Sequence, residues 1–82
     1  MMITKDDVEL ARHAPWLETP RVDDTSPENS ALFTIGTIIE AQVREASRPL
    51  RDVVDEMVRR FSPWGLDSRL AETAYRYVHC WG

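Results

Sequence analysis

The neighbouring residues His79 and Cys80 are the one place in the sequence where an imidazole and a thiol stand together. A cysteine nucleophile needs a base within hydrogen-bonding reach of its sulfur. Adjacent residues on a helix point about 100° apart, so this pair does not meet that need. His13 is far away in the sequence, and two histidines with one cysteine do not make up a zinc site. We therefore expect neither thiol catalysis nor a bound metal.

Asp23 and Asp24 are a second candidate, because paired carboxylates can exchange protons with a substrate. No further carboxylate or base is placed by its spacing to work with them. The three glycines, at positions 36, 65 and 82, stand too far apart to form a glycine-rich phosphate loop. The sequence thus predicts a protein that is not an enzyme and that uses no cofactor.

Two of the three tryptophans, Trp16 and Trp64, directly follow a proline at the end of a predicted helix. Such a tryptophan either closes a small core or, when exposed, anchors a binding partner, since tryptophan is frequent in binding hot spots. The segment after Trp16 is rich in carboxylates. We predict that these aromatic and acidic residues bind another protein, and they are Trp16, Glu18, Asp23, Asp24, Glu28 and Trp64.

The formal net charge is −4, and it is unevenly distributed. Residues 1–40 carry eight acids and three bases, whereas residues 41–82 carry six acids and seven arginines. An acidic protein is a poor candidate for general nucleic-acid binding, which depends on neutralising phosphates. We expect the acidic half to meet a basic surface on another protein, such as one that otherwise binds nucleic acid.

An arginine-bearing helix near the C-terminus supports a different hypothesis. The last two predicted helices, joined by a short turn with Gly65, have the spacing of a DNA-reading helix-turn-helix. Glu72 lies within the face that would contact DNA, and the acidic N-terminal half also opposes binding to phosphates. DNA binding is therefore the alternative function, and a structural subunit of an oligomer is a third. The DNA-contacting residues would be Ser68, Arg69, Thr73 and Arg76.

Helix-start signals occur twice in the N-terminal half. Thr4 followed by Asp7 resembles a capping box and predicts a short helix that ends near His13. Residues 14–29 contain three prolines and predict a loop. Within its last residues, Ser26-Pro27-Glu28 combines a capping hydroxyl, a first-turn proline and an acid, and predicts a helix over residues 27–47.

Apolar residues cover more than half the circumference of this second helix. It is therefore either the central helix of the domain or the seam of a homodimer through residues 31–46. Residues 32–39 include Gly36 and many β-branched side chains, which is typical of a strand, with a partner strand then expected in residues 16–24. Because no clear partner strand exists, we expect a helix. Gln42 falls within the apolar arc, and a buried amide must find hydrogen-bond partners. We expect it to cap a backbone group or fix the register, and recognition of a ligand is the alternative.

The most regular apolar stripe lies in residues 47–61, at steps of three and four. Pro49 suits the first turn of this third helix, and Pro63 ends it. On its charged face we expect the ion pairs Asp55–Arg59 and Glu56–Arg60. A fourth helix is expected over residues 68–81, capped by Asp67 or Ser68. The stripe of the third helix consists of Leu50, Val53, Val54, Met57, Val58 and Phe61.

These patterns together predict an all-α fold, a small compact bundle of three main helices plus a short N-terminal helix, in one domain over residues 1–82. No apolar run approaches the roughly 20 residues that span a bilayer, and the N-terminus has no apolar signal core. We expect a cytoplasmic protein without a membrane segment. Its expected function is that of a small acidic, non-enzymatic interaction module: a regulator, adaptor or inhibitor that binds another protein.

Overall fold

A computed structural model describes residues 3–14 and 26–81 of the chain. These residues form the α-helices α1 (Lys5–Arg12), α2 (Pro27–Glu45), α3 (Leu50–Phe61) and α4 (Ser68–Trp81), with a 3-10 turn, η2 (Ser62–Trp64), between α3 and α4. The described part of the chain contains no strand. The predicted all-α bundle of three main helices plus a short N-terminal helix is therefore confirmed, and residues 32–39 are helical.

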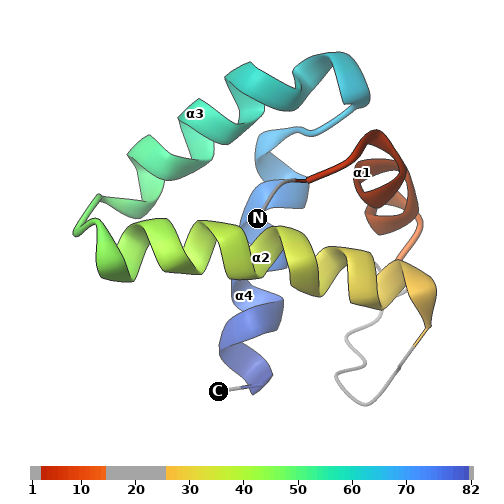
Figure 1. Ribbon diagram of the computed structural model, residues 1–82, viewed down its shortest axis with the longest axis horizontal. Helices are drawn as coiled ribbons and strands as arrows, with labels where there is room; N and C mark the ends of the chain where they lie inside the picture. The colour runs from red at the N-terminus through yellow and green to blue at the C-terminus, as the bar shows by residue number, and fades with distance from the viewer. Residues whose placement is uncertain (1–2, 15–25, 82) are drawn as a thin grey trace.

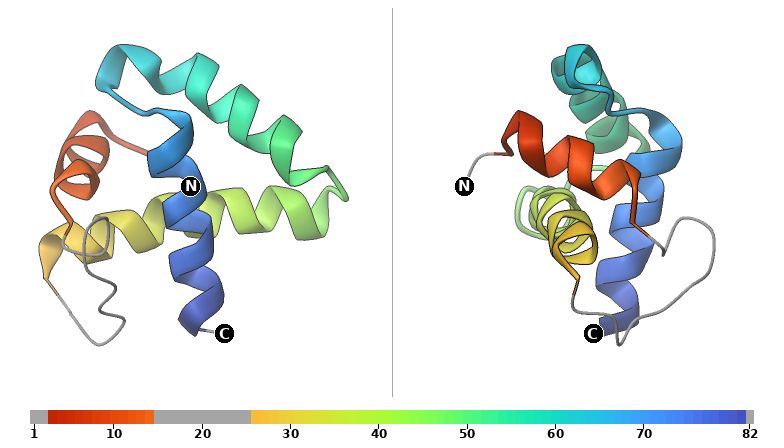
Figure 2. Two further views of the ribbon diagram at one scale, coloured as in Figure 1. Left: turned by 180° about the vertical axis from the view of Figure 1, so that it is seen from behind. Right: turned by 90° about the vertical axis from the view of Figure 1, so that its right-hand side faces the viewer.

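The helix α2 is the axis of the bundle. In Figure 1, α1 lies over its N-terminal half, and α4 runs behind it at a steep angle. Figure 2 shows the same crossing from behind, with α3 joined to the C-terminal end of α2 and rising away from it. The helix begins where the sequence predicts, since the Ser26 hydroxyl accepts a hydrogen bond from the Asn29 N–H at 3.2 Å.

The crossing of α2 and α4 is closest at Gly36. A Cβ atom on this residue would lie 2.1 Å from the carbonyl oxygen of Ala74 and 2.5 Å from Cγ2 of Val78. No real Cβ atom tolerates such distances, so only glycine lets the two backbones approach this closely. The glycine that made residues 32–39 resemble a strand is thus part of a helix-to-helix contact.

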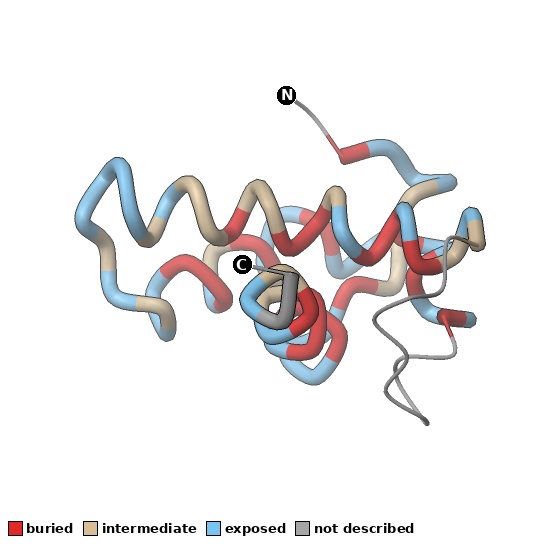
Figure 3. The backbone as a smooth tube through the Cα atoms, turned by 90° about the horizontal axis from the view of Figure 1, so that it is seen from below, coloured by how far each residue is buried: buried red, intermediate tan, exposed pale blue. Residues whose placement is uncertain are grey.

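The core is drawn from every helix, and buried residues recur along each one (Figure 3). Leu32, Ile35 and Ile39 of α2 are completely buried. The wide apolar face of α2 is covered by the chain's own helices, which makes it the central helix of the domain. A homodimer through residues 31–46 stays a prediction. The buried apolar residues are Ile3, Val8, Ala11, Ala14, Ala31, Leu32, Ile35, Ile39, Val53, Val54, Met57, Phe61, Leu66, Leu70, Ala71, Ala74 and Tyr77.

At the N-terminus, the predicted capping box is present. The Thr4 hydroxyl accepts a hydrogen bond from the Asp7 N–H at 3.1 Å, and the Asp7 carboxylate accepts one from the Thr4 N–H at 3.2 Å. The loop predicted over residues 14–29 is shorter at its end, because α2 already begins at Pro27. Its residues 15–25 lie outside the described part of the chain.

The connection from α2 to α3 differs from the prediction. The helix α2 ends at Glu45, two residues early, and Ser47 follows in a left-handed conformation with φ of +54°. The helix α3 then begins at Leu50. Pro49 is its N-cap residue rather than part of its first turn, and no side chain caps this end.

The turn from α3 to α4 follows the sequence signals. Gly65 has φ of +97°, a conformation that side chains other than glycine's rarely permit. Asp67 caps α4, since its carboxylate accepts a hydrogen bond from the Leu70 N–H at 2.7 Å. The fourth helix has the predicted bounds. None of the described helices combines the length and apolar character that crossing a membrane requires.

Candidate functional site

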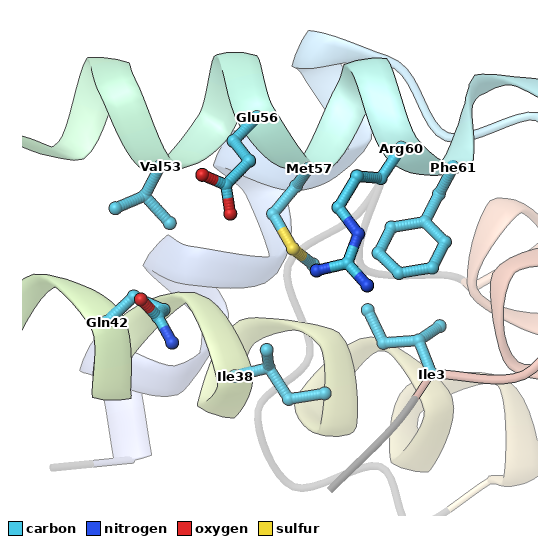
Figure 4. Close-up of a pocket in the computed structure, with 8 residues that line it drawn as sticks. All are labelled: Ile3, Ile38, Gln42, Val53, Glu56, Met57, Arg60 and Phe61. Carbon is cyan, nitrogen blue, oxygen red and sulfur yellow. The ribbon is translucent and has the colours of Figure 1, made fainter.

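An open groove lies between α2 and α3 in the described part of the chain, and we call it the α2–α3 groove (Figure 4). The two helices meet at residues 46–49 and diverge from there (Figure 1). The hollow between them has a volume of about 130 Å³. Its lining residues are Ile3, Ile38, Gln42, Val53, Glu56, Met57, Arg60 and Phe61.

The middle of the groove is apolar. Val53, Met57 and Phe61 stand four residues apart on α3. Figure 4 shows their side chains directed away from α3, with Met57 above Ile38 of α2. Ile3, which precedes α1, lines the groove near Phe61 and is 2% exposed. Three residues of the predicted α3 stripe, Val53, Met57 and Phe61, therefore belong to the hydrophobic core and also form one wall of the groove.

One end of the groove is bridged by hydrogen bonds. Arg48, from the connection between the helices, donates to the Glu56 carboxylate at 2.9 Å and, at a long 3.5 Å, to the Gln42 side-chain oxygen. The hydrogen bond from Arg48 and the positive charge of Arg48 lower the pKa of the Glu56 carboxyl. Gln42 is exposed, so its prediction as a buried amide is wrong. It bonds to a side chain and caps no backbone group among the described contacts.

The other end of the groove carries the positive charge of Arg60. This side chain is exposed, and its guanidinium carbon lies 5.4 Å from the centre of the Phe61 ring. The predicted ion pairs Glu56–Arg60 and Asp55–Arg59 do not form among the described residues. Glu56 pairs with Arg48 instead, because the connection before α3 brings that guanidinium within reach. Arg60 therefore forms no direct ion pair with a carboxylate in the described part of the chain, although its positive charge also lowers the pKa of Glu56.

Most of the predicted partner-binding residues cannot be placed beside this groove. Trp16, Glu18, Asp23 and Asp24 lie outside the described residues. Glu28 is half-buried in the first turn of α2.

Trp64, in contrast, lies next to the groove. It is half-buried and packs on the hydrophobic core. Its ring centre is 5.2 Å from that of Phe61, the residue that also lies beneath the guanidinium of Arg60. Trp64 therefore supports the cationic end of the groove through Phe61.

The predicted DNA-contacting face of α4 is only partly exposed. Ser68, Arg69 and Arg76 are exposed, but Thr73 is 7% exposed and belongs to the buried side of the helix. Thr73 is adjacent in sequence to the core residue Ala74, which packs against Gly36 of α2. Glu72 is exposed, as expected, on the face between the two arginines.

A second hollow, of about 180 Å³, is lined by Arg12, Asp67, Arg69 and Leu70. Here Asp67 already caps α4, and the side chain of Arg12 lies against Gly65. These contacts join α1 to the start of α4, so we interpret the hollow as part of the fold.

His79 is also a structural residue. Its Nε2 atom lies 2.9 Å from the carboxylate of Glu40, which forms a second contact, at 2.8 Å, with Arg44. This contact ties α4 to α2.

The described part of the chain contains no group of three or more side chains suited to hold a metal ion. The thiol of Cys80 and the carboxylates of Asp23 and Asp24 lie outside that part.

Sequence reasoning missed the α2–α3 groove, and it missed Ile3 and Arg48 entirely. The available signal was the apolar stripe on α3, three of whose residues, Val53, Met57 and Phe61, line the groove. Nothing in the local pattern shows that α2 and α3 diverge, because their angle depends on the connection at residues 46–49. Comparisons of the chain with protein families, curated proteins and solved structures gave no match.

Proposed function

We propose that this chain is a small acidic, non-enzymatic interaction module that binds a segment of another protein in the α2–α3 groove. The observation that supports the proposal is the groove itself, with an apolar middle of Ile38, Val53 and Met57 and polar groups at both ends. Interfaces between proteins have the same anatomy, an apolar centre inside a polar rim. As a regulator, adaptor or inhibitor, the module would act by binding a segment of its partner in this groove.

The size of the groove favours a protein ligand over a metabolite. Pockets for small molecules usually have volumes of about 300–1,000 Å³ and bury most of their ligand. The α2–α3 groove offers about 130 Å³. An apolar cavity of about 150 Å³ holds one benzene molecule, so the groove fits one large apolar side chain. An anchor of this kind, extending from a partner, is typical of binding hot spots.

The acidic residues would contribute to partner binding outside the groove. Glu18, Asp23 and Asp24, together with Glu28 at the start of α2, would attract a basic surface of the partner. Charges of this kind increase the rate of encounter more than they increase the final affinity. Trp16 and Trp64 would supply aromatic contact area, Trp64 through its position beside Phe61.

The proposal is tested by photo-crosslinking in lysate of the source cells. A photoreactive amino acid placed at Gln42, exposed in the groove, should capture a defined protein that survives nuclease treatment. The same group at Arg51, exposed on α3 but not among the groove-lining residues, is the matched control. Equal capture from both positions, or no specific capture at Gln42, would overturn the proposal.

DNA binding through α4 is the second candidate, supported by the exposure of Arg69 and Arg76 on one helix. In that case Arg69→Ala and Arg76→Ala should abolish binding to duplex DNA. Each lost phosphate contact should also reduce the salt dependence of binding by about one unit of slope. Unchanged duplex binding in both variants would exclude this function.

A further inference from the structure

The α2–α3 groove has a positive charge at one end, on Arg60, that forms no direct ion pair with a carboxylate among the described residues, although Glu56 interacts with it at longer range. At the end near residues 46–49, Arg48 and Glu56 neutralise one another at 2.9 Å. At the end near Phe61, the guanidinium of Arg60 forms no direct ion pair with a carboxylate in the described part of the chain. In Figure 4 this guanidinium extends from α3 toward the space above Ile38 and Ile3. A ligand in the groove would therefore gain from a negative charge at this end only.

The secondary structure around the groove restricts the form of the ligand. The described part of the chain has no strand, so it has no strand edge to which a peptide could add. The walls of the groove are two helices that diverge, and the side chains of a third helix can pack between them as ridges into grooves. Helical ligands in such grooves present apolar anchors spaced three or four residues apart.

From these observations, and resting on the proposed protein-interaction function, we infer that the groove binds an amphipathic helix of a partner protein. One large apolar side chain of that helix occupies the space between Ile38 and Met57, and an aspartate or glutamate pairs with Arg60. Met57 and Arg60 are three residues apart, which is about 4.5 Å along α3. The acid of the ligand therefore follows or precedes its anchor by about one helical turn.

Two neighbouring arginines provide a matched test. Arg59 and Arg60 are both exposed in the last turn of α3, but only Arg60 lines the groove. The variants Arg60→Glu and Arg59→Glu carry the same change in charge at adjacent positions. Circular dichroism should show the same helical content for both. A difference in binding between them then reports on the groove and not on net charge or folding.

The probe is a displayed library of helical peptides, selected on the immobilised full chain. We expect enriched peptides to carry a large apolar residue with an acid three or four positions away. Arg60→Glu should weaken their binding about tenfold or more, as for a charge pair at an interface, whereas Arg59→Glu should change it less than about twofold. Replacing the acid of the peptide by lysine should restore binding to Arg60→Glu.

Several outcomes would overturn the inference. They are enriched peptides that lack an acid, binding that Arg60→Glu and Arg59→Glu weaken equally, and a library that yields no binder. A concentration-dependent dimer in light scattering that Arg60→Glu abolishes would identify a second copy of the chain as the occupant instead. The crosslinking from Gln42 is independent of all these results. If it captures a partner while the peptide test fails, the proposed function stands and only the helical acidic ligand is rejected.

Discussion

Arg48 donates a hydrogen bond of 2.9 Å to Glu56, and through it the connection before α3 is tied to the middle of that helix. The contact has two consequences for the α2–α3 groove. It closes one end by linking α3 to Gln42 of α2 through a single guanidinium. The contact also engages the carboxylate of Glu56, which stands four residues before Arg60 on α3 and could otherwise pair with it. Arg60 therefore leaves the other end of the groove positive.

The first prediction concerns the titration of Glu56. Its pKa lies below the ordinary value of 4.5, first because of the hydrogen bond from Arg48 and then because of the charge of Arg48. A carboxyl whose pKa is lowered by folding stabilises the fold above its unfolded pKa, and this contribution is lost as the pH falls through the folded pKa. In Arg48→Met the pKa of Glu56 should rise toward 4.5. The stability difference from the wild type should be largest above pH 4.5 and shrink in more acidic solution.

An NMR titration of the Glu56 carboxyl carbon measures this shift directly. Arg44→Met is the control, because it removes the contact of Arg44 with Glu40 and leaves Arg48 in place. An unchanged pKa of Glu56 in Arg48→Met would show that the hydrogen bond does not persist in solution.

The second prediction concerns the closest contact of α2 and α4. In Gly36→Ala, the new Cβ would meet the backbone oxygen of Ala74, which cannot turn aside as a side-chain end can. Alanine favours a helix over glycine by about 1 kcal/mol. Overpacking costs about 1–3 kcal/mol or more, and this site has no free space, so we expect a net loss of about 1–3 kcal/mol.

Urea denaturation of Gly36→Ala and of Ser30→Ala tests this expectation. Ser30 is exposed on α2, where alanine should change the free energy of unfolding by less than about 0.5 kcal/mol. A Gly36→Ala protein as stable as the wild type would mean that the two helices lie further apart than described.

The third prediction concerns the residue after the end of α2. Ser47 has φ of +54°, the left-handed conformation in which glycine has an advantage over other residues. Ser47→Gly should therefore raise the free energy of unfolding by about 0.5–1 kcal/mol. Ser62→Gly is the matched control, since Ser62 has an ordinary right-handed conformation with φ of −58°. Ser62→Gly should lower the free energy of unfolding. If thermal unfolding shows that both variants shift the midpoint in the same direction, the left-handed conformation of Ser47 is contradicted.

These sites separate what the sequence could predict from what it could not. Local signals were sufficient for the helix starts at Thr4, Ser26 and Asp67, because each cap is made by a residue within three positions of its donor. The extent of α4 could also be predicted locally, because apolar residues such as Leu70, Ala74 and Tyr77 recur at helical spacing along it. The strand-like residues 32–39 became helical because the packing of α2 overrides the weak preference of β-branched residues.

The errors share a cause, which is that they depend on contacts between distant residues. The rule for ion pairs four residues apart predicted Glu56–Arg60, but a residue before the helix, Arg48, competes for that carboxylate. Thr73 was assigned to the exposed face of α4 because it is polar, but it is buried, and the polarity of a residue does not show how far the rest of the fold covers its helix. The groove was missed because it arises from the angle between two helices, and no single helix encodes that angle.

The last prediction concerns the acidic segment and applies to the partner captured by crosslinking. If Asp23 and Asp24 steer a basic surface toward the groove, Asp23→Asn with Asp24→Asn should slow association several-fold at low ionic strength while leaving the dissociation rate nearly unchanged. The difference should fade as added salt shortens the screening length from about 30 Å at 0.01 M to about 8 Å at 0.15 M. Surface plasmon resonance over a salt series measures both rates.

A double variant with the same change in net charge is the control for this experiment. Asp52→Asn with Asp55→Asn removes two exposed carboxylates from α3, neither of which lines the groove. Steering by a local acidic segment predicts a larger effect for positions 23 and 24 than for positions 52 and 55. Equal effects would assign the attraction to the net charge of −4 as a whole, and no effect in either variant would remove electrostatics from the mechanism. If neither double variant changes association, the apolar anchor between Ile38 and Met57 would have to account for binding without help from charge. Association should then be insensitive to salt.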